Sequence, residues 1–304
     1  MMKTVQILLS SYNGEKYISR QIDSILQQKD VEVHLLIRDD GSTDGTRAII
    51  KEYEKKYPAN VKVVLGENMG WKKSFFTLLQ LAGAYDYYAF ADQDDYWYED
   101  KEISSIKVME DDSAEGPKLV QVNMIYSDEA LNPIYPIPSP RAVQIRLHDE
   151  IYADDFFLGC SMTWNSKAME LFQRYFPLGN FGHDHWCGVI CYLFGKVYFS
   201  PAKKFCYIRH EGNASTVGNK FHGRLNRVKS LVVGDTDVYD NFGPDLLKGY
   251  SDLMKPHDLQ ICRDFVNYRH DYHAKLRLLL NKNLKRSNLF STVLFKVCIF
   301  LGKM

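Results

Sequence analysis

The chain has 304 residues, which is enough for one full α/β catalytic domain and a smaller appendage. Hydrophobic residues make up 45% and charged residues 25%, a globular composition that excludes disordered and fibrous proteins. Lysine plus arginine and aspartate plus glutamate both total 38, which excludes the broad basic field of a nucleic-acid-binding protein. The six cysteines form no C-x-x-C pair, so we expect reduced, buried thiols.

The apolar segments favour a cytoplasmic protein. The run near the N-terminus is typical of a β-strand and is followed by no cleavage site, so we expect no export signal. The longest apolar stretch, residues 290–301, is interrupted by Lys296 and is shorter than the roughly 20 residues of a spanning helix.

Short apolar runs alternate with helical patterns through the first hundred residues. The runs predict strands over residues 5–9, 33–37, 61–65 and 87–91. Apolar residues at helical spacing predict helices over residues 17–26, 47–56 and 72–82. This alternation predicts an α/β fold with a mostly parallel, doubly wound sheet.

The pattern changes in the second half of the chain. A strand is expected over residues 119–126, a proline-rich loop over 133–140 and a small-residue segment over 159–163. From about Phe221 the pattern is helical, with Leu276, Leu279 and Leu280 on one face. We therefore predict a catalytic domain of residues 1–218 and a helical C-terminal region of residues 219–304.

Acidic residues follow the fourth predicted strand. Ligands of doubly wound sheets bind beyond the carboxyl ends of the strands. Asp92, Asp94 and Asp95 stand there in ADQDDYW, and crowded carboxylates need a cation or hydrogen-bond donors nearby. They suit Mg²⁺ or Mn²⁺ bridging the phosphates of a nucleotide. The alternative is a solvated acidic turn that caps a helix.

A second acidic pair, Asp39 and Asp40 in IRDDGSTDGT, ends the second predicted strand. A carboxylate there can accept hydrogen bonds from a pyrimidine imide or a ribose hydroxyl. The alternative is again a helix cap, for which Ser42 and Asp44 are suitable residues.

Five motifs occur in the order seen in glycosyltransferase family 2, and about residues 3–215 resemble that family. They are LSSYNGEKYI, RDDGSTDGT, ENMG, ADQDDYW and HDHW. The chain is most similar to the subgroup of bacterial rhamnosyltransferases of cell-wall and capsular polysaccharide assembly. The resemblance implies a GT-A fold with a nucleotide-sugar half of about residues 1–100 and an acceptor half of about residues 101–218.

The resemblance also implies site residues. Asp94 would be the direct ligand of a divalent metal, Mn²⁺ or Mg²⁺, with His210 as a second ligand and Asp92 facing the ribose or the metal. Lys72 is an alternative to Lys73 as the phosphate contact. The implied nucleotide-sugar-binding residues are Ser10, Tyr12, Glu15, Asp40, Lys73 and Asp92.

In the same family pattern Asp184 stands at the position of the catalytic base. An inverting transfer needs a carboxylate within hydrogen-bond reach of the acceptor hydroxyl. Trp186 would stack on the acceptor sugar. The alternatives are that Asp184 caps the helix that follows and that Trp186 belongs to the core.

The implied reaction is the transfer of a sugar from a nucleotide-diphosphate sugar to a saccharide acceptor that is lipid-linked. dTDP-L-rhamnose is the leading donor, and a UDP-hexose is the alternative. A non-catalytic polysaccharide-assembly subunit is the rival interpretation. A nucleotidyltransferase is disfavoured because residues 10–15 are not a basic glycine-rich loop, and a dehydrogenase because no G-x-G-x-x-G follows the first strand.

The last residues, 284–304, mix four basic side chains with a broad apolar surface. Such a segment can lie in the interface of a membrane, here the inner face of the plasma membrane, as a peripheral contact. The alternative is a helix packed on the catalytic domain. The basic residues are Lys285, Arg286, Lys296 and Lys303.

Overall fold

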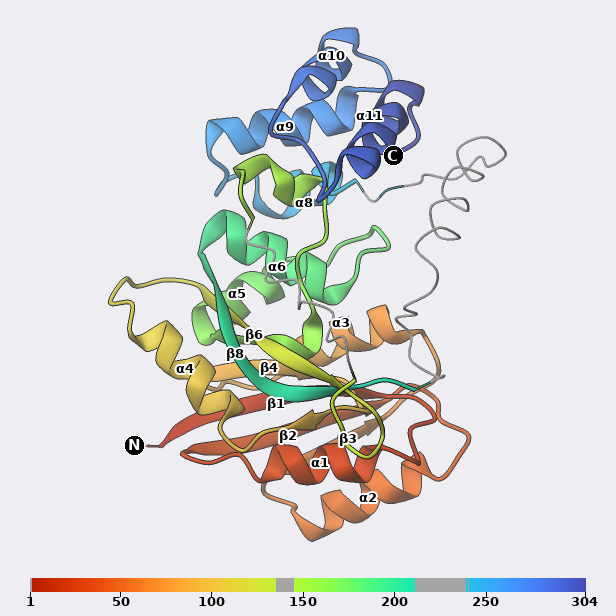
Figure 1. Cartoon of the computed structure of the whole chain (residues 1–304), viewed down its shortest axis with the longest axis vertical. Coiled ribbons are helices and arrows are strands. Elements are labelled where there is room, and N and C mark those ends of the chain that lie inside the picture. The colour runs from red at the N-terminus through yellow and green to blue at the C-terminus, as the bar shows by residue number, and fades with distance from the viewer. Residues whose placement is uncertain (1, 135–144, 211–238, 240) are drawn as a thin grey trace. The chain divides into compact units, whose positions relative to one another are not determined.

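A computed structural model describes residues 2–134, 145–210, 239 and 241–304 (Figure 1). Contacts divide the chain into two compact units. The first unit is made of Met1–Gln144, Phe157–Phe176 and Gly182–Glu211, and the second of Ile145–Phe156, Pro177–Phe181 and Gly212–Met304.

The second unit is therefore larger than the predicted helical region of residues 219–304. It also takes in Ile145–Phe156 and Pro177–Phe181, which lie inside the predicted catalytic domain. The predicted boundary near Gly218 and most of the predicted proline-rich loop lie outside the described residues.

The first unit is built on an eight-stranded sheet with the order β3-β2-β1-β4-β7-β6-β8-β5. Strands β3, β2, β1 and β4 are parallel, whereas β7 runs antiparallel to both β4 and β6. The sheet is thus parallel in its first half and mixed in its second. The strands are β1 (Lys3–Ser11), β2 (Val31–Asp39), β3 (Val61–Leu65), β4 (Tyr87–Ala91), β5 (Tyr96–Trp97), β6 (Lys118–Ser127), β7 (Met162–Asn165) and β8 (Lys196–Ile208).

Helices cover both faces of this sheet, and Figure 1 shows α1 and α2 on one side and α3 on the other. The helices of the unit are α1 (Ile18–Leu26), α2 (Thr46–Lys56), α3 (Trp71–Leu81), α4 (Lys101–Glu110), α5 (Ser166–Arg174) and α6 (His183–Phe194), with the short 3-10 helix η2 (Gly159–Ser161).

The two faces follow from the alternation of side chains along β1 and β4. Ile7 belongs to the buried cluster that includes Ile22 of α1. The ring of Phe90 meets Phe75 of α3 at 5.4 Å between centroids and Trp164 at 4.5 Å. Because both faces are covered, strands near the centre of the sheet are apolar along most of their length, which is why they were predictable.

The second unit is helical. Its elements are η1 (His148–Tyr152), α8 (Gly243–Tyr250), α9 (Pro256–Asn267), α10 (Tyr272–Leu280) and α11 (Leu289–Leu301). Ion pairs join them: Arg277 of α10 binds Asp264 of α9 at 2.6 Å, and His148 of η1 binds Asp258 of α9 at 2.6 Å. Within the described part of the chain, every helix is too short or too polar to cross a membrane.

Candidate active site

Three segments that are far apart in sequence bring the predicted metal and base residues together. Asp92 and Asp94 follow strand β4, Asp184 stands in the first turn of α6, and His210 follows strand β8. His210 Nε2 and Asp94 Oδ2 lie 2.8 Å apart. The charge of Asp184 acts on Asp92, so this carboxylate also belongs to the group.

Asp92 shows how crowded these charges are. Burial and the neighbouring carboxylates of Asp94 and Asp184 raise the pKa of Asp92 to about 7. A divalent cation would relieve this repulsion, and two carboxylates with one imidazole form a donor set that suits Mn²⁺. The residues present therefore fit the metal that the sequence predicted.

A second group lies next to the first. Single ligand atoms of Asp92, Asp95 and Cys160 all lie within 4.8 Å of one another. Asp95 is only 1% exposed, and its Oδ2 has no hydrogen-bond partner among the described residues. Burial and the charges of Asp95 and Asp92 raise the pKa of the Cys160 thiol well above its usual range. A protonated thiol donates a hydrogen bond, so in this structure Cys160 supports the neighbouring carboxylates.

Asp184 is held by two backbone N–H groups. Gly159 donates to its Oδ2 at 3.2 Å, and His185 donates to its Oδ1 at 2.9 Å. The carboxylate thus lies in the first turn of α6 and accepts a hydrogen bond from the helix backbone, which resembles the helix-cap alternative. It also faces the carboxylates after β4. A base position and a helix-terminal position are compatible here.

The neighbouring His183 is a packing residue. It is 3% exposed and stacks on Phe75 with a centroid separation of 3.8 Å. Burial lowers the pKa of His183 to about 3, so the ring is neutral. A Cβ added to Gly159 would lie 2.7 Å from His183 Nε2, so this close approach requires glycine. Because Gly159 of η2 packs directly against His183, its backbone N–H lies within hydrogen-bond reach of Asp184.

The acceptor platform predicted at Trp186 is not supported, because this indole is 0% exposed and packs near Tyr175 in the core. Trp71, the first residue of α3, is 48% exposed instead. A Cβ added to Gly182 would lie 2.6 Å from Asp184 Oδ1 and 3.6 Å from Trp71 Cη2. The exposed indole beside the candidate base is therefore Trp71, which was not predicted from the sequence. Its position directly after ENMG, at the same edge of the sheet, was the available signal.

The loop after β1 is tied to the loop after β4 by Gln93. Its Oε1 accepts from the Tyr12 N–H at 2.9 Å, and its Nε2 donates to the Tyr12 carbonyl at 3.0 Å. Tyr12, one of the predicted nucleotide-binding residues, is 46% exposed. Gln93, which was not predicted, thus fixes the backbone of an exposed aromatic residue beside the carboxylates.

Asp40 is buried, with an exposure of 2%, and accepts hydrogen bonds from neighbouring residues of the protein. Arg38 donates to its Oδ1 at 2.5 Å, and the N–H groups of Met69 and Gly70 donate to its two oxygens at 3.0 and 2.9 Å. Gly70 has a φ of +85°, a conformation that favours glycine. The structure therefore gives Asp40 the task of shaping the loop before α3, in place of the free acceptor that the sequence predicted.

The other predicted nucleotide contacts lie at the end of β1, in the loop after it and on α3. Ser10 Oγ is 2.6 Å from Ser74 Oγ, and Glu15 accepts from the Gly45 N–H at 2.8 Å. Lys73 is exposed on α3, while Lys72 places its Nζ 5.6 Å from the centre of the Trp71 ring.

His210 is oriented by residues that were not predicted as part of the site. The rings of Tyr17 and His210 stack with a centroid separation of 4.3 Å. Glu129, after β6, accepts hydrogen bonds from Tyr17 at 3.0 Å and from Lys16 at 2.7 Å. The Tyr17 ring therefore packs on one face of the imidazole that contacts Asp94 and fixes its orientation.

Known proteins resemble the chain at the level of sequence. Residues 6–172, more than half of the chain, match the family model described as Glycosyl transferase family 2. The dTDP-rhamnosyl transferase RfbG of Shigella flexneri is 41% identical over 97 residues, which are 31% of this chain and 34% of that protein. The chain thus spans about a third of this curated relative.

Solved structures share the fold across nearly the whole chain. S. aureus TarS in complex with UDP-GlcNAc has a TM-score of 0.57 and 18% identity, covering 99% of this chain and 92% of that one. Mannosyltransferase PcManGT from Pyrobaculum calidifontis in complex with GDP-Man and Mn²⁺ has a TM-score of 0.50 and 17% identity, covering 100% of this chain and 89% of that one. At such identities the likeness concerns the fold alone, and it confirms the predicted GT-A fold.

Proposed function

Because the chain belongs to glycosyl transferase family 2, we propose that its first unit transfers a sugar from a nucleotide diphosphate to a saccharide acceptor, with inversion at the anomeric carbon. The observation that supports this most is the convergence of Asp92, Asp94, Asp184 and His210 from three separate segments. This group offers a cation site and a carboxylate base within one cluster of side chains.

The proposed cation is Mn²⁺ or Mg²⁺, held by Asp94 and His210 with Asp92 beside them. When bound, such an ion neutralises the charge of a diphosphate leaving group. The crowding that raises the pKa of Asp92 to about 7 supports the site, because a cation stabilises the ionised form. The Mn²⁺ in the complex of PcManGT is a parallel from a protein of the same fold.

Asp184 is the proposed base. Its carboxylate would accept the proton of the acceptor hydroxyl as that oxygen attacks the anomeric carbon. The N–H groups of Gly159 and His185 hold the carboxylate in place. Trp71, exposed next to Gly182, would stack on a sugar ring.

Nucleotide recognition is proposed for the loops after β1 and before α3. Tyr12 would pack on the base, while Ser10 and Glu15 would contact the base or ribose. Lys73, exposed on α3, would contact a phosphate. Asp40 would act indirectly, through the loop that it holds.

The proposed donor is dTDP-L-rhamnose, because RfbG is named a dTDP-rhamnosyl transferase and is 41% identical over the matched 97 residues. A UDP-hexose is the alternative donor. The proposed acceptor is a lipid-linked saccharide of cell-surface polysaccharide assembly.

The substitution Asp184→Asn tests the proposed base. It keeps the shape of the side chain and removes its basicity, so transfer should fall about 10²- to 10⁴-fold while nucleotide affinity stays nearly unchanged. Product formation from a panel of nucleotide sugars measures the first effect, and calorimetric titration with the nucleotide diphosphate measures the second. Asp111→Asn, at an exposed carboxylate after α4, is the matched control. A loss of less than tenfold in Asp184→Asn would mean that another residue is the base.

The rival function is a non-catalytic assembly subunit with the same fold. It predicts nucleotide-sugar binding without turnover of any donor in the wild-type protein. The grouping of a carboxylate base with the cation site disfavours it, because a subunit without chemistry does not need Asp184 beside Asp92.

A further inference from the structure

Helix α11 presents apolar side chains on two opposite sides. Phe295, Cys298 and Ile299 are buried within the second unit. The exposed side chains of this helix are all large and apolar, with exposures between 39% and 79%. They are Leu289, Phe290, Val293, Val297, Phe300 and Leu301, and we call them the α11 outer face.

The α11 outer face is continuous. At about 100° per residue its six side chains fall within an arc of roughly 120° around the helix. A continuous apolar face of this kind is unfavourable in water and marks a surface that another apolar phase covers. The 13 residues of the helix span only about 20 Å, so it can lie on a bilayer of about 30 Å and cannot cross it.

The surrounding charge is positive. Residues 269–304 contain eight lysine and arginine residues and one aspartate. Two of the four predicted membrane-facing basic residues serve the fold instead: Arg286 pairs with Asp154 at 2.7 Å, and Lys296 donates to the Asn281 carbonyl at 3.0 Å. A third, Lys285, keeps a side chain that is 44% exposed and lies 3.9 Å from Glu150, at the limit of an ion pair. Lys282 and Lys285 come before the helix and Lys303 comes after it, so basic residues flank the apolar face at both ends.

We propose that the α11 outer face docks on an anionic lipid bilayer. The six apolar side chains enter the boundary between head groups and acyl chains, and Lys282, Lys285 and Lys303 lie among the anionic head groups. A second copy of the chain fits this face less well, because pairing would bring two positively charged segments together. The inner side of the helix packs within the second unit, and its outer side binds lipid.

This docking is independent of the transfer reaction. Its consequence, that the enzyme meets a lipid-linked acceptor at the membrane surface, rests on the proposed function. Vesicle binding is measured without a donor or an acceptor, so a failure of docking and a failure of transfer are distinguishable.

Co-sedimentation of the full chain with vesicles tests the proposal. Wild-type protein should bind vesicles of phosphatidylglycerol and phosphatidylcholine, and more weakly vesicles of phosphatidylcholine alone. Salt should weaken the binding to anionic vesicles without abolishing it, because the apolar contact is not screened. The double variant Val293→Ser/Phe300→Ser should lower the partition coefficient by at least about tenfold, since both side chains are exposed and apolar.

Leu178→Ser is the matched control, because Leu178 is an 80% exposed leucine outside α11. It should bind vesicles like the wild type. Lys282→Glu tests the electrostatic part and should weaken binding at low salt only. Equal binding of wild type and double variant would overturn the proposal. So would a wild-type dimer that the double variant dissociates, combined with no binding to anionic vesicles, since the face would then contact a second copy.

Discussion

Cys160 occupies an unusual place for a thiol, next to two carboxylates. Hydrogen bonding from its sulfur lowers the pKa of Asp92 and of Asp95, but burial and the neighbouring negative charges outweigh that effect in both groups. The Ile208 N–H also binds Asp95, and Ile208 stands two residues before His210. Asp95 therefore joins the loop after β4 to the end of β8, close to His210, and Cys160 joins the same loop to η2.

The two tryptophans at the site should respond differently to substitution. Trp71→Ala removes an exposed indole beside Asp184, so it should raise the KM for the sugar substrate several-fold and leave the thermal midpoint nearly unchanged. Trp186→Ala empties a fully buried site and should cost about 3–5 kcal/mol of stability. Steady-state kinetics and thermal denaturation measure these effects. Unchanged kinetics in Trp71→Ala, or an unchanged midpoint in Trp186→Ala, would contradict the assignment.

The acidic residues of the site were predictable, whereas the exposed indole was not. Asp92, Asp94 and Asp184 stand in motifs directly after a strand or at the start of a helix, so their position at the sheet edge follows from chain order. Trp186 stands in HDHW, and Trp71 stands directly after ENMG. Which indole is exposed depends on how α3 and α6 pack, and this packing leaves no local trace in the sequence.

Strand prediction succeeded for β1 to β4 and for β6, and it missed β5, β7 and β8. The bounds of β3 and β4 agree with the predicted runs, residues 61–65 and 87–91. β8 contains Pro201, and its pairing with β6 shifts where Gln121 pairs with Phe199 and Asn123 pairs with Lys203. Residues between Phe199 and Lys203 bulge out of the ladder, which tolerates the proline. The proline and the lysines interrupt the apolar pattern, so this strand was not predicted, although it ends two residues before His210.

The contact between η1 and α9 predicts a pH-dependent stability. The hydrogen bond to Asp258, which is buried, raises the pKa of His148. Burial alone would raise the pKa of Asp258, but hydrogen bonds from His148 and Tyr152 outweigh it and lower this pKa. Asp149 and Lys255 also act on His148, with opposite signs.

The signs of these shifts define a window. The His148 contribution is fully present below its ordinary pKa of 6.5 and is lost as the pH rises through the raised value. The Asp258 contribution is present above its ordinary pKa of 3.8 and is lost as the pH falls through the lowered value. His148→Gln should therefore lower the thermal midpoint more at mildly acidic pH than at alkaline pH. Equal differences at both pH values would show that the ion pair is not formed.

At the scale of the molecule, the second unit draws on segments far apart in the chain. Arg286, before α11, pairs with Asp154, after η1, and the N–H groups of Leu178 and Gly179 donate to Asp245 of α8 at 2.9 and 3.0 Å. These contacts explain why Ile145–Phe156 and Pro177–Phe181 group with the C-terminal helices. A boundary drawn along the sequence cannot show such an arrangement, because it assumes that each unit is continuous.

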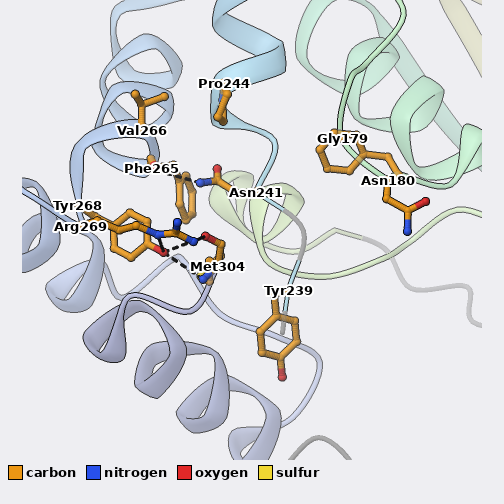
Figure 2. A pocket seen from close by; sticks show the side chains of 11 residues that line it. Gly179, Asn180, Tyr239, Asn241, Pro244, Phe265, Val266, Tyr268, Arg269 and Met304 are labelled. Atoms are coloured by element: carbon orange, nitrogen blue, oxygen red, sulfur yellow. Dashed lines mark hydrogen bonds between the residues drawn. The ribbon is translucent and has the colours of Figure 1, made fainter. Parts of the chain in front are cut away.

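The second unit also holds a cavity of about 370 Å³, lined by Asn180, Asn241, Phe265, Arg269 and other residues (Figure 2). Arg269 and Tyr268 bind the Met304 carbonyl at its wall, and Figure 2 shows this contact. The residues that line this cavity belong to the second unit, whereas the carboxylates of the candidate active site belong to the first.

The central claim is that the first unit binds a nucleotide-diphosphate sugar through a divalent cation on Asp94 and His210. Calorimetric titration with dTDP and UDP, in Mn²⁺ and in chelator, tests it most directly. We predict that Mn²⁺ raises the affinity for one of these nucleotides by at least about tenfold, and that Asp94→Asn removes this gain while Asp111→Asn keeps it. Equal affinity in Mn²⁺ and in chelator for the wild-type protein, or no binding of either nucleotide, would contradict the claim.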